Sequence, residues 1–236
     1  MNSWLVSPQQ AKTWTGRIEL TASLCLLTLV LATRSTQALT LGQVDTFQDG
    51  TTDNWTTGHG GPTNIPSGGP AGAGDAYMRV VSTGGSGTDS KLVVFNASQW
   101  LGDYTDAGIT GITMDLDNFG AQTLSMRLAF FQSRGVGYAS TTPFSLPADS
   151  NWHQAFFPLV AADFTALGSP SASFSSLLSN FTGQLRILDS ASPSVDGDTI
   201  AATLGVDDVM AVPEPSTFVM VAGSLAAMLL YRRRPS

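Results

Sequence analysis

The side chains with the greatest capacity for chemistry in this chain are its aspartates. Residues 39–211 contain 16 aspartates and no glutamate against five arginines and lysines, which gives this stretch a net charge of −11. Paired carboxylates can hydrolyse glycosidic bonds, but no motif here singles out one pair. An envelope polysaccharide hydrolase using paired aspartates is therefore the alternative hypothesis. Phosphate groups repel so acidic a region, which argues against nucleic acid as a partner.

Other catalytic groups are sparse. The two histidines, His59 and His153, lie far apart in the sequence and have no carboxylate at metal-ligand spacing. The single cysteine, Cys25, lies in an N-terminal apolar run, so residues 39–211 have no thiol and no disulfide. There is no Gly-x-Ser-x-Gly motif, and the glycine-rich segment 68–74 lacks the lysine of a phosphate-binding loop. We predict that the protein is not an enzyme.

Aromatic side chains offer a different chemistry. The C–H faces of sugars stack on exposed rings, while nearby polar groups bond to the hydroxyls. Trp100 and Tyr104 lie in a polar, loop-like segment. Together with Tyr138 they are the predicted glycan-binding residues. The alternative is that the rings pack in or beside a core, as we expect above all for Trp55 and Trp152.

The segments that position these residues have the pattern of short β-strands. In residues 112–116 and 124–128 every second residue is apolar, as in strands with one buried face. Residues 161–167 and 174–181 are expected to form short surface helices, and 58–74 an irregular loop. The predicted fold class is all-β, a two-sheet antiparallel β-sandwich with jelly-roll order. Its expected strands are 76–82, 91–96, 111–118, 123–132, 153–159, 184–189 and 199–210.

Three segments resemble carbohydrate-binding-module-like and galactose-binding-like jelly rolls. They are Asp45-Thr46-Phe47-Gln48-Asp49-Gly50 before Asn54-Trp55, the segment 151–159, and Gly205-Val206-Asp207-Asp208-Val209. The resemblance implies that the first and last strands are neighbours and hold a structural calcium ion, which takes six to eight oxygen ligands. Asp45, Asp49 and Asp207 are the expected ligands. Because side chains alternate along a strand, only one of Asp207 and Asp208 is expected to take part.

The C-terminus combines three parts. Pro213, Glu214 and Pro215 precede an uncharged apolar run, 218–231, which Arg232, Arg233 and Arg234 follow. The run suits a short transmembrane helix of about 21 Å, and clustered arginines stay on the cytoplasmic side. This order closely resembles the PEP-CTERM sorting domain, also called the ice-binding protein C-terminal domain. The resemblance implies recognition and cleavage at the Pro-Glu-Pro box by an exosortase. The alternative is an anchor that is never cut.

The N-terminus is consistent with export. Lys12 and Arg17 precede the apolar run 20–32, and small residues precede a predicted cleavage site after Ala38. We therefore expect a signal peptide (1–38), a β-sandwich body (39–211) and a sorting signal (212–236). The expected protein is exported, held transiently or permanently in the membrane by its C-terminal helix, and located in the envelope, cell surface or extracellular matrix. Its expected partners are the sorting protease, the secretion machinery, the membrane and a glycan.

Overall fold

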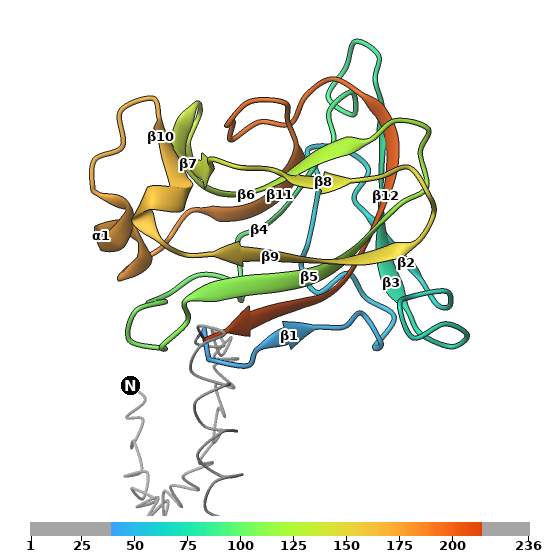
Figure 1. Ribbon diagram of the computed structural model, residues 1–236, viewed down its shortest axis with the longest axis horizontal. Coiled ribbons are helices and arrows are strands. Elements are labelled where there is room, and N and C mark those ends of the chain that lie inside the picture. Colours follow the sequence, from blue (N-terminus) through green and yellow to red (C-terminus); the bar gives the residue numbers. More distant parts are fainter. Residues whose placement is uncertain (1–38, 214–236) are drawn as a thin grey trace, which may run out of the picture. The chain divides into compact units, whose positions relative to one another are not determined.

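The alternating segments form two antiparallel sheets in the computed structural model, which describes residues 39–213 (Figure 1). Sheet A has the strand order β2-β3-β12-β5-β9, with β1 also paired to β12. Its strands are β1 (Val44–Asp45), β2 (Thr63–Ile65), β3 (Tyr77–Thr83), β5 (Gly111–Asn118), β9 (Trp152–Pro158) and β12 (Ala201–Val212). The prediction of an all-β, two-sheet antiparallel sandwich is confirmed.

Sheet B has the order β10-β7-β6-β11-β4, with β8 also paired to β6. Its strands are β4 (Val93–Asn96), β6 (Leu124–Ser133), β7 (Val136–Ser140), β8 (Phe144–Leu146), β10 (Phe164–Leu167) and β11 (Gln184–Asp189). The chain passes repeatedly between the sheets, for example from β4 in sheet B to β5 in sheet A and on to β6 in sheet B.

Helical structure within residues 39–213 is limited to one α-helix and one 3₁₀ turn. The helix α1 (Phe174–Leu178) confirms one of the two predicted helices, and Ser173 caps it by accepting a hydrogen bond from the backbone N–H of Ser176. The helix predicted at 161–167 is wrong. A 3₁₀ turn (Ala161–Asp163) is followed there by strand β10, because antiparallel pairing with β7 overrides local helix preference.

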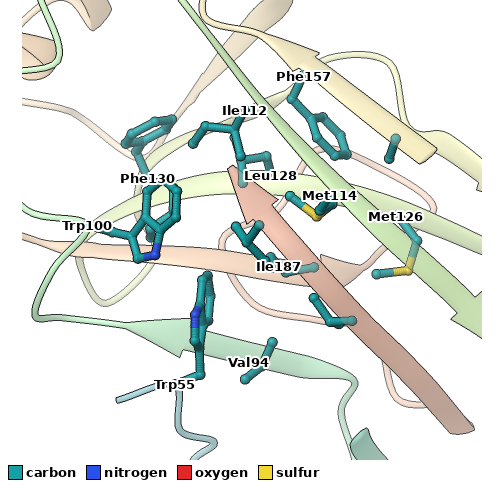
Figure 2. Packing of buried hydrophobic residues seen from close by; sticks show 14 of the residues in the cluster. Trp55, Val94, Trp100, Ile112, Met114, Met126, Leu128, Phe130, Phe157 and Ile187 are labelled. Atoms are coloured by element: carbon teal, nitrogen blue, oxygen red, sulfur yellow. The ribbon is translucent and has the colours of Figure 1, made fainter. Parts of the chain in front are cut away.

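Alternate residues of both sheets meet in one apolar core. The rings of Trp55 and Trp100 lie 6.5 Å apart between their centroids, and Phe130, Met114 from sheet A and Met126 from sheet B belong to the same core (Figure 2). Trp55 is 2% exposed, which confirms the prediction that it packs. In sheet A, the side chains between these inward residues point away from the core, so that sheet presents a second, outer face.

The first and last strands of the described region are neighbours, as the resemblance implied. Val44 pairs with Met210 and Asp45 with Val209 in an antiparallel register. Between Asp207 and Met210 the register of β12 with β5 shifts, and Asp208 has a φ of 46°. This irregularity breaks the side-chain alternation in the segment that carries two of the chain's aspartates.

Several predictions concern residues outside the described range. The signal peptide (1–38) and the part of the sorting signal from Glu214 onward lie there, including the apolar run 218–231 and the three arginines. Among the residues that the structure describes, no helix has the length and hydrophobicity needed to span a membrane.

Candidate functional site

The three rings predicted to bind glycan belong to the core. Trp100 and Tyr104 are 0% exposed and Tyr138 is 8% exposed. The Tyr104 hydroxyl donates to the backbone oxygen of Trp100, and the Tyr138 hydroxyl donates to that of Ala172. A sugar cannot stack on a ring that is covered on both faces. In this structure the three residues are therefore packing residues, and the predicted platform must be corrected.

Asp45, the first predicted calcium ligand, is the centre of a buried hydrogen-bond network. The indole N–H groups of Trp55 and Trp100 each donate to Asp45 Oδ2 at 2.7 Å, and Gln99 Nε2 donates to the same oxygen at 3.1 Å. Burial raises the pKa of Asp45 to about 6, although the hydrogen bonds from Trp100 and Trp55 lower it. Asp45 Oδ2 thus already accepts three hydrogen bonds, two of them from buried tryptophans.

Asp49, the second predicted ligand, lies in an exposed turn. Its Oδ1 accepts hydrogen bonds from both the backbone N–H and the hydroxyl of Thr51, each at 2.8 Å, and these bonds lower its pKa. Within residues 39–213, no group of three or more His, Cys, Asp or Glu side chains is placed to hold a metal ion. The structure therefore does not gather Asp45, Asp49 and Asp207 into one site.

Asp207, the third predicted ligand, has a different set of neighbours. It is 1% exposed, and its Oδ2 is buried without a hydrogen-bond partner. Burial raises its pKa to about 7; the charges of Asp208, Asp75 and Asp115 add to the rise, and the backbone N–H of Asp208 opposes it. Asp208 thus acts on the same cluster as Asp207. The expectation that strand alternation would separate the two is wrong, because the irregularity in β12 intervenes.

Gly69 marks the place where two of these carboxylates converge. A Cβ atom at Gly69 would lie 2.6 Å from Asp75 Oδ2 and 2.9 Å from Asp207 Oδ2. Asp75 Oδ2 accepts from the backbone N–H of Ala71, but Asp207 Oδ2 has no partner. The structure thus places an orphaned buried oxygen next to a second carboxylate, where only glycine fits. These are two of the six to eight oxygens that a calcium ion takes. Asp75 and Asp207 are the residues that would hold the ion.

A different site appears on the outer face of sheet A, where three aromatic rings gather. This aromatic cluster consists of Tyr77, Phe119 and Trp152. Its ring centroids lie 5.2 Å apart for Tyr77 and Trp152, 5.9 Å for Tyr77 and Phe119, and 6.4 Å for Phe119 and Trp152. Tyr77 is buried, Trp152 is half-buried and Phe119 is 38% exposed. Ring surface therefore remains open to solvent.

Gly205 of β12 makes room for the aromatic cluster. A Cβ there would lie 2.8 Å from Trp152 Cη2 and 3.0 Å from Phe119 Cε2, so both rings lie directly over the backbone of the central strand. The Trp152 indole donates to the backbone oxygen of Gly68 at 3.0 Å, which fixes the ring. The sequence had suggested packing for Trp152. The glycine inside an apolar strand was the signal of a close approach.

Polar side chains border the aromatic cluster. Arg79, Gly205, Asp117 and Trp152 occupy one row across four strands, and Arg79 is exposed. Asp117 is buried, its Oδ1 has no hydrogen-bond partner, and its pKa is raised by burial and by the charge of Asp149.

His153, beside Trp152, has a carboxylate partner that the sequence spacing did not suggest. Its Nε2 lies 3.1 Å from both carboxylate oxygens of Asp149, and this contact lowers the pKa of Asp149. Both side chains are partly exposed. The pair adds polar groups at the end of β9 near the aromatic cluster.

The outer face of sheet B, in contrast, is covered. Residues 190–198 fold over it, and Val195 is 3% exposed in a small second core with Ala129, Ala139 and Leu188. Arg186 Nη1 donates to the backbone oxygen of Val195 at 2.6 Å, and its guanidinium lies 3.5 Å from the centroid of the Phe131 ring.

Arg127 closes the same face beneath the loop. Its Nε and Nη2 donate to the backbone oxygens of Ser190 and Ala191, and its Nη1 donates to those of Ser140 and Thr141. Because loop and guanidinium fill this surface, the outer face of sheet A is the more accessible of the two.

A groove of about 410 Å³ beside the loop contains two aspartates, Asp189 and Asp198. Asp189 Oδ1 accepts from the backbone N–H of Ser125, and the oxygens of Asp198 accept from the Ser190 hydroxyl and the Ala191 N–H. These carboxylates anchor the ends of the loop, which is a structural task.

Comparison with known proteins reveals similarity of fold. No protein-family model matches the chain, and no curated protein matches its sequence. The sandwich is similar to part of an exo-β-agarase, with a TM-score of 0.51 and 12% identity over 74% of this chain. The match covers 25% of the agarase, so this chain spans about a quarter of its length.

Two carbohydrate-binding modules show a looser likeness. A family 11 module from Clostridium thermocellum, solved with a β-1,3-1,4-mixed-linked tetrasaccharide, has a TM-score of 0.46 and 14% identity over 73% of this chain and 96% of its own. A module specific for non-crystalline cellulose has a TM-score of 0.35 and 11% identity over 74% and 97%. At these identities the comparisons concern the fold alone.

Proposed function

We propose that this chain is an exported, non-enzymatic surface or matrix protein whose jelly-roll body binds a glycan on the outer face of sheet A. The observation that carries the proposal is the aromatic cluster, with Phe119 and Trp152 partly open to solvent. A sugar ring would stack its C–H face on Trp152 or Phe119. Arg79, which is exposed, would donate to its hydroxyls.

The test is polysaccharide binding by single variants. We expect Trp152→Ala and Phe119→Ala each to weaken binding roughly tenfold, since aromatic contacts are worth on the order of 1 kcal/mol beyond the area they bury. Phe156→Ala is the matched control, because Phe156 is 37% exposed on the same sheet but lies outside the aromatic cluster. Equal binding by all three variants and the parent would contradict the proposed site.

The hydrolase alternative is tested with the same polymers. Reducing-sugar release by the parent chain, lost in Asp189→Asn and Asp198→Asn, would favour an enzyme that uses the groove beside loop 190–198. If the parent chain releases no reducing sugar from a broad panel of polymers, the hydrolase alternative fails and glycan binding remains the proposed function. The hydrogen bonds that already occupy both carboxylates favour the second outcome.

The proposed location of the protein is inferred from the sequences of its N- and C-terminal segments. The signal peptide directs export, and an exosortase-type protease recognises Pro213, Glu214 and Pro215 while the run 218–231 holds the chain in the membrane. Mass spectrometry of the mature protein from its native cell tests this. A C-terminus between residues 213 and 216 supports cleavage, whereas an intact end at Arg232, Arg233 and Arg234 supports a permanent anchor.

A structural calcium ion is the second part of the proposal, with Asp75 and Asp207 as ligands. At pH 8, millimolar calcium should raise the melting temperature relative to chelator, because a ligand present at 100 times its Kd stabilises the folded state by about 2.7 kcal/mol. Asp75→Asn and Asp207→Asn should abolish the rise, whereas Asp49→Asn should keep it. Identical melting of the parent with calcium and with chelator would exclude the ion.

A further inference from the structure

Exposed apolar side chains gather at one end of sheet A. Six large apolar residues are exposed within residues 39–213, and four of them, Leu41, Val44, Phe156 and Val160, lie around the end of β12 with exposures of 37–47%. The remaining two, Val81 and Phe119, lie at the opposite end of the sheet, next to Thr203.

The strand register places these side chains together. Val44, Met210, Thr113 and Phe156 form one row across β1, β12, β5 and β9. Neighbouring strands are about 4.8 Å apart, so this row is about 14 Å wide. Along β12, Val209 and Ala211 are buried while Met210 is half-buried, so Met210 faces outward with Val44 and Phe156.

The next row completes the patch. A Cβ at Gly111 would collide with the Phe156 ring and lie 3.4 Å from Val212 Cγ2, so both side chains cover this glycine. The backbone next to Leu41 and Val160 is tied to the same strand end. Gly42 N donates to Ala211 O, Thr110 N donates to Val212 O, and Leu159 N donates to Thr110 O. We call Leu41, Val44, Phe156, Val160, Met210 and Val212 the exit patch.

The chain itself indicates what covers the exit patch. Pro213 follows Val212 directly, and the uncharged run 218–231 begins five residues later. Five residues extend at most about 17 Å, so a membrane that holds this run must lie close to the end of β12 (Figure 1). The exit patch contains no charged residue. Its side chains therefore suit an uncharged interface and need no anionic lipid.

We propose that the exit patch rests on the lipid surface while the C-terminal run holds the protein in the membrane. This inference depends on the proposed membrane tether and adds an orientation to it. The end of sheet A with β1 and the end of β12 faces the bilayer. The aromatic cluster lies toward the other end of the same face, since Trp152 and Phe156 are four residues, about 13 Å, apart along β9. A sheet that meets the bilayer with the β12 end leaves the cluster beyond the lipid surface and accessible to a glycan.

The test uses the full chain reconstituted in phosphatidylcholine vesicles, with Cys25→Ser as background. A polarity-sensitive fluorophore is attached at Val44→Cys, at Val160→Cys or, as the matched control, at Val81→Cys. Val81 is 57% exposed on the same sheet, at its other end. We expect blue-shifted emission and quenching by spin-labelled lipid at positions 44 and 160, and neither at position 81.

The outcomes separate the two proposals. If the chain floats with the vesicles but the fluorophores at 44 and 160 stay in a polar environment, the exit-patch proposal fails and the tether stands. Blue-shifted emission without lipid quenching means that another protein surface covers the patch, and this also overturns the proposal. If the chain does not associate with vesicles, the tether fails and the exit-patch proposal fails with it.

Discussion

Asp45 is the acceptor on which two buried tryptophans depend. Asp45→Ala would leave the indole N–H groups of Trp55 and Trp100 without a partner inside the core. Each unpaired buried donor costs about 1–3 kcal/mol, so we expect the free energy of unfolding to fall by about 3 kcal/mol. Chemical denaturation measures it. Asp49→Ala, at an exposed turn, is the control, and equal midpoints for both variants would contradict the assigned role.

Asp207 makes stability depend on pH. Its folded-state pKa of about 7 lies above its ordinary value of 3.8. Between these values the folded state holds a proton that the unfolded state has lost, so stability rises as the pH falls. Asp45, with a pKa of about 6, acts in the same direction at lower pH.

In chelator, the melting temperature should therefore rise when the pH is lowered from 7.5 to 5.5. Asp207→Asn should remove the rise above about pH 6, where Asp207 alone contributes, and make the rise below pH 6 shallower, where Asp45 still contributes. Scanning calorimetry at several pH values measures both. A parent melting temperature that falls steadily over this range would show that neither carboxyl has a raised pKa.

At the scale of elements, two guanidinium groups, those of Arg127 and Arg186, hold loop 190–198 to sheet B. Arg127 donates four hydrogen bonds to backbone oxygens on both sides of the contact. Lysine keeps the charge but cannot reproduce the planar fork. Arg127→Lys should therefore lower the free energy of unfolding by about 2–4 kcal/mol and raise amide exchange in residues 190–198. Unchanged exchange there would mean that the remaining contacts, among them Val195 and its hydrogen bond from Arg186, hold the loop without Arg127.

The elements also show what sequence patterns can and cannot predict. Strand β5 was predicted at its observed bounds because its alternation is regular and turn residues flank it. Strand β7 (Val136–Ser140) was not among the expected strands, because its five residues show no clear alternation and its extended form depends on pairing with β6. The helix expected near Phe164 gave way to pairing in the same manner.

The candidate site, like strand β7, depends on contacts between distant segments that the local sequence does not reveal. Tyr77, Phe119 and Trp152 come from distant parts of the chain, and only the register across β3, β12, β5 and β9 brings them together. Their types suggested sugar binding, but nothing local distinguished them from the buried Trp100 and Tyr104. Of the two carboxylates that converge at Gly69, Asp207 was singled out from the sequence but Asp75 was not. The position of Asp75 depends on how the chain folds around Gly69.

At the scale of the whole molecule, charge limits the choice of glycan. Residues 39–211 have a net charge of −11, which repels uronate polymers. We expect neutral β-glucans to bind more tightly than alginate of similar length at low salt. The gap should narrow between 0.01 and 0.1 M salt, as the screening length falls from about 30 Å to about 10 Å. Tighter binding of alginate at low salt would contradict this.

The position of β12 has a consequence for the order in which the protein is built. This strand is the last of the described region, yet it lies between β3 and β5 in the middle of sheet A. Until residues 201–212 emerge, the two halves of the sheet have no common partner and the core cannot close. During the proposed export, this topology would keep a chain that is still passing through a channel unfolded. Sheet A can be completed only after β12 (Ala201–Val212) has emerged.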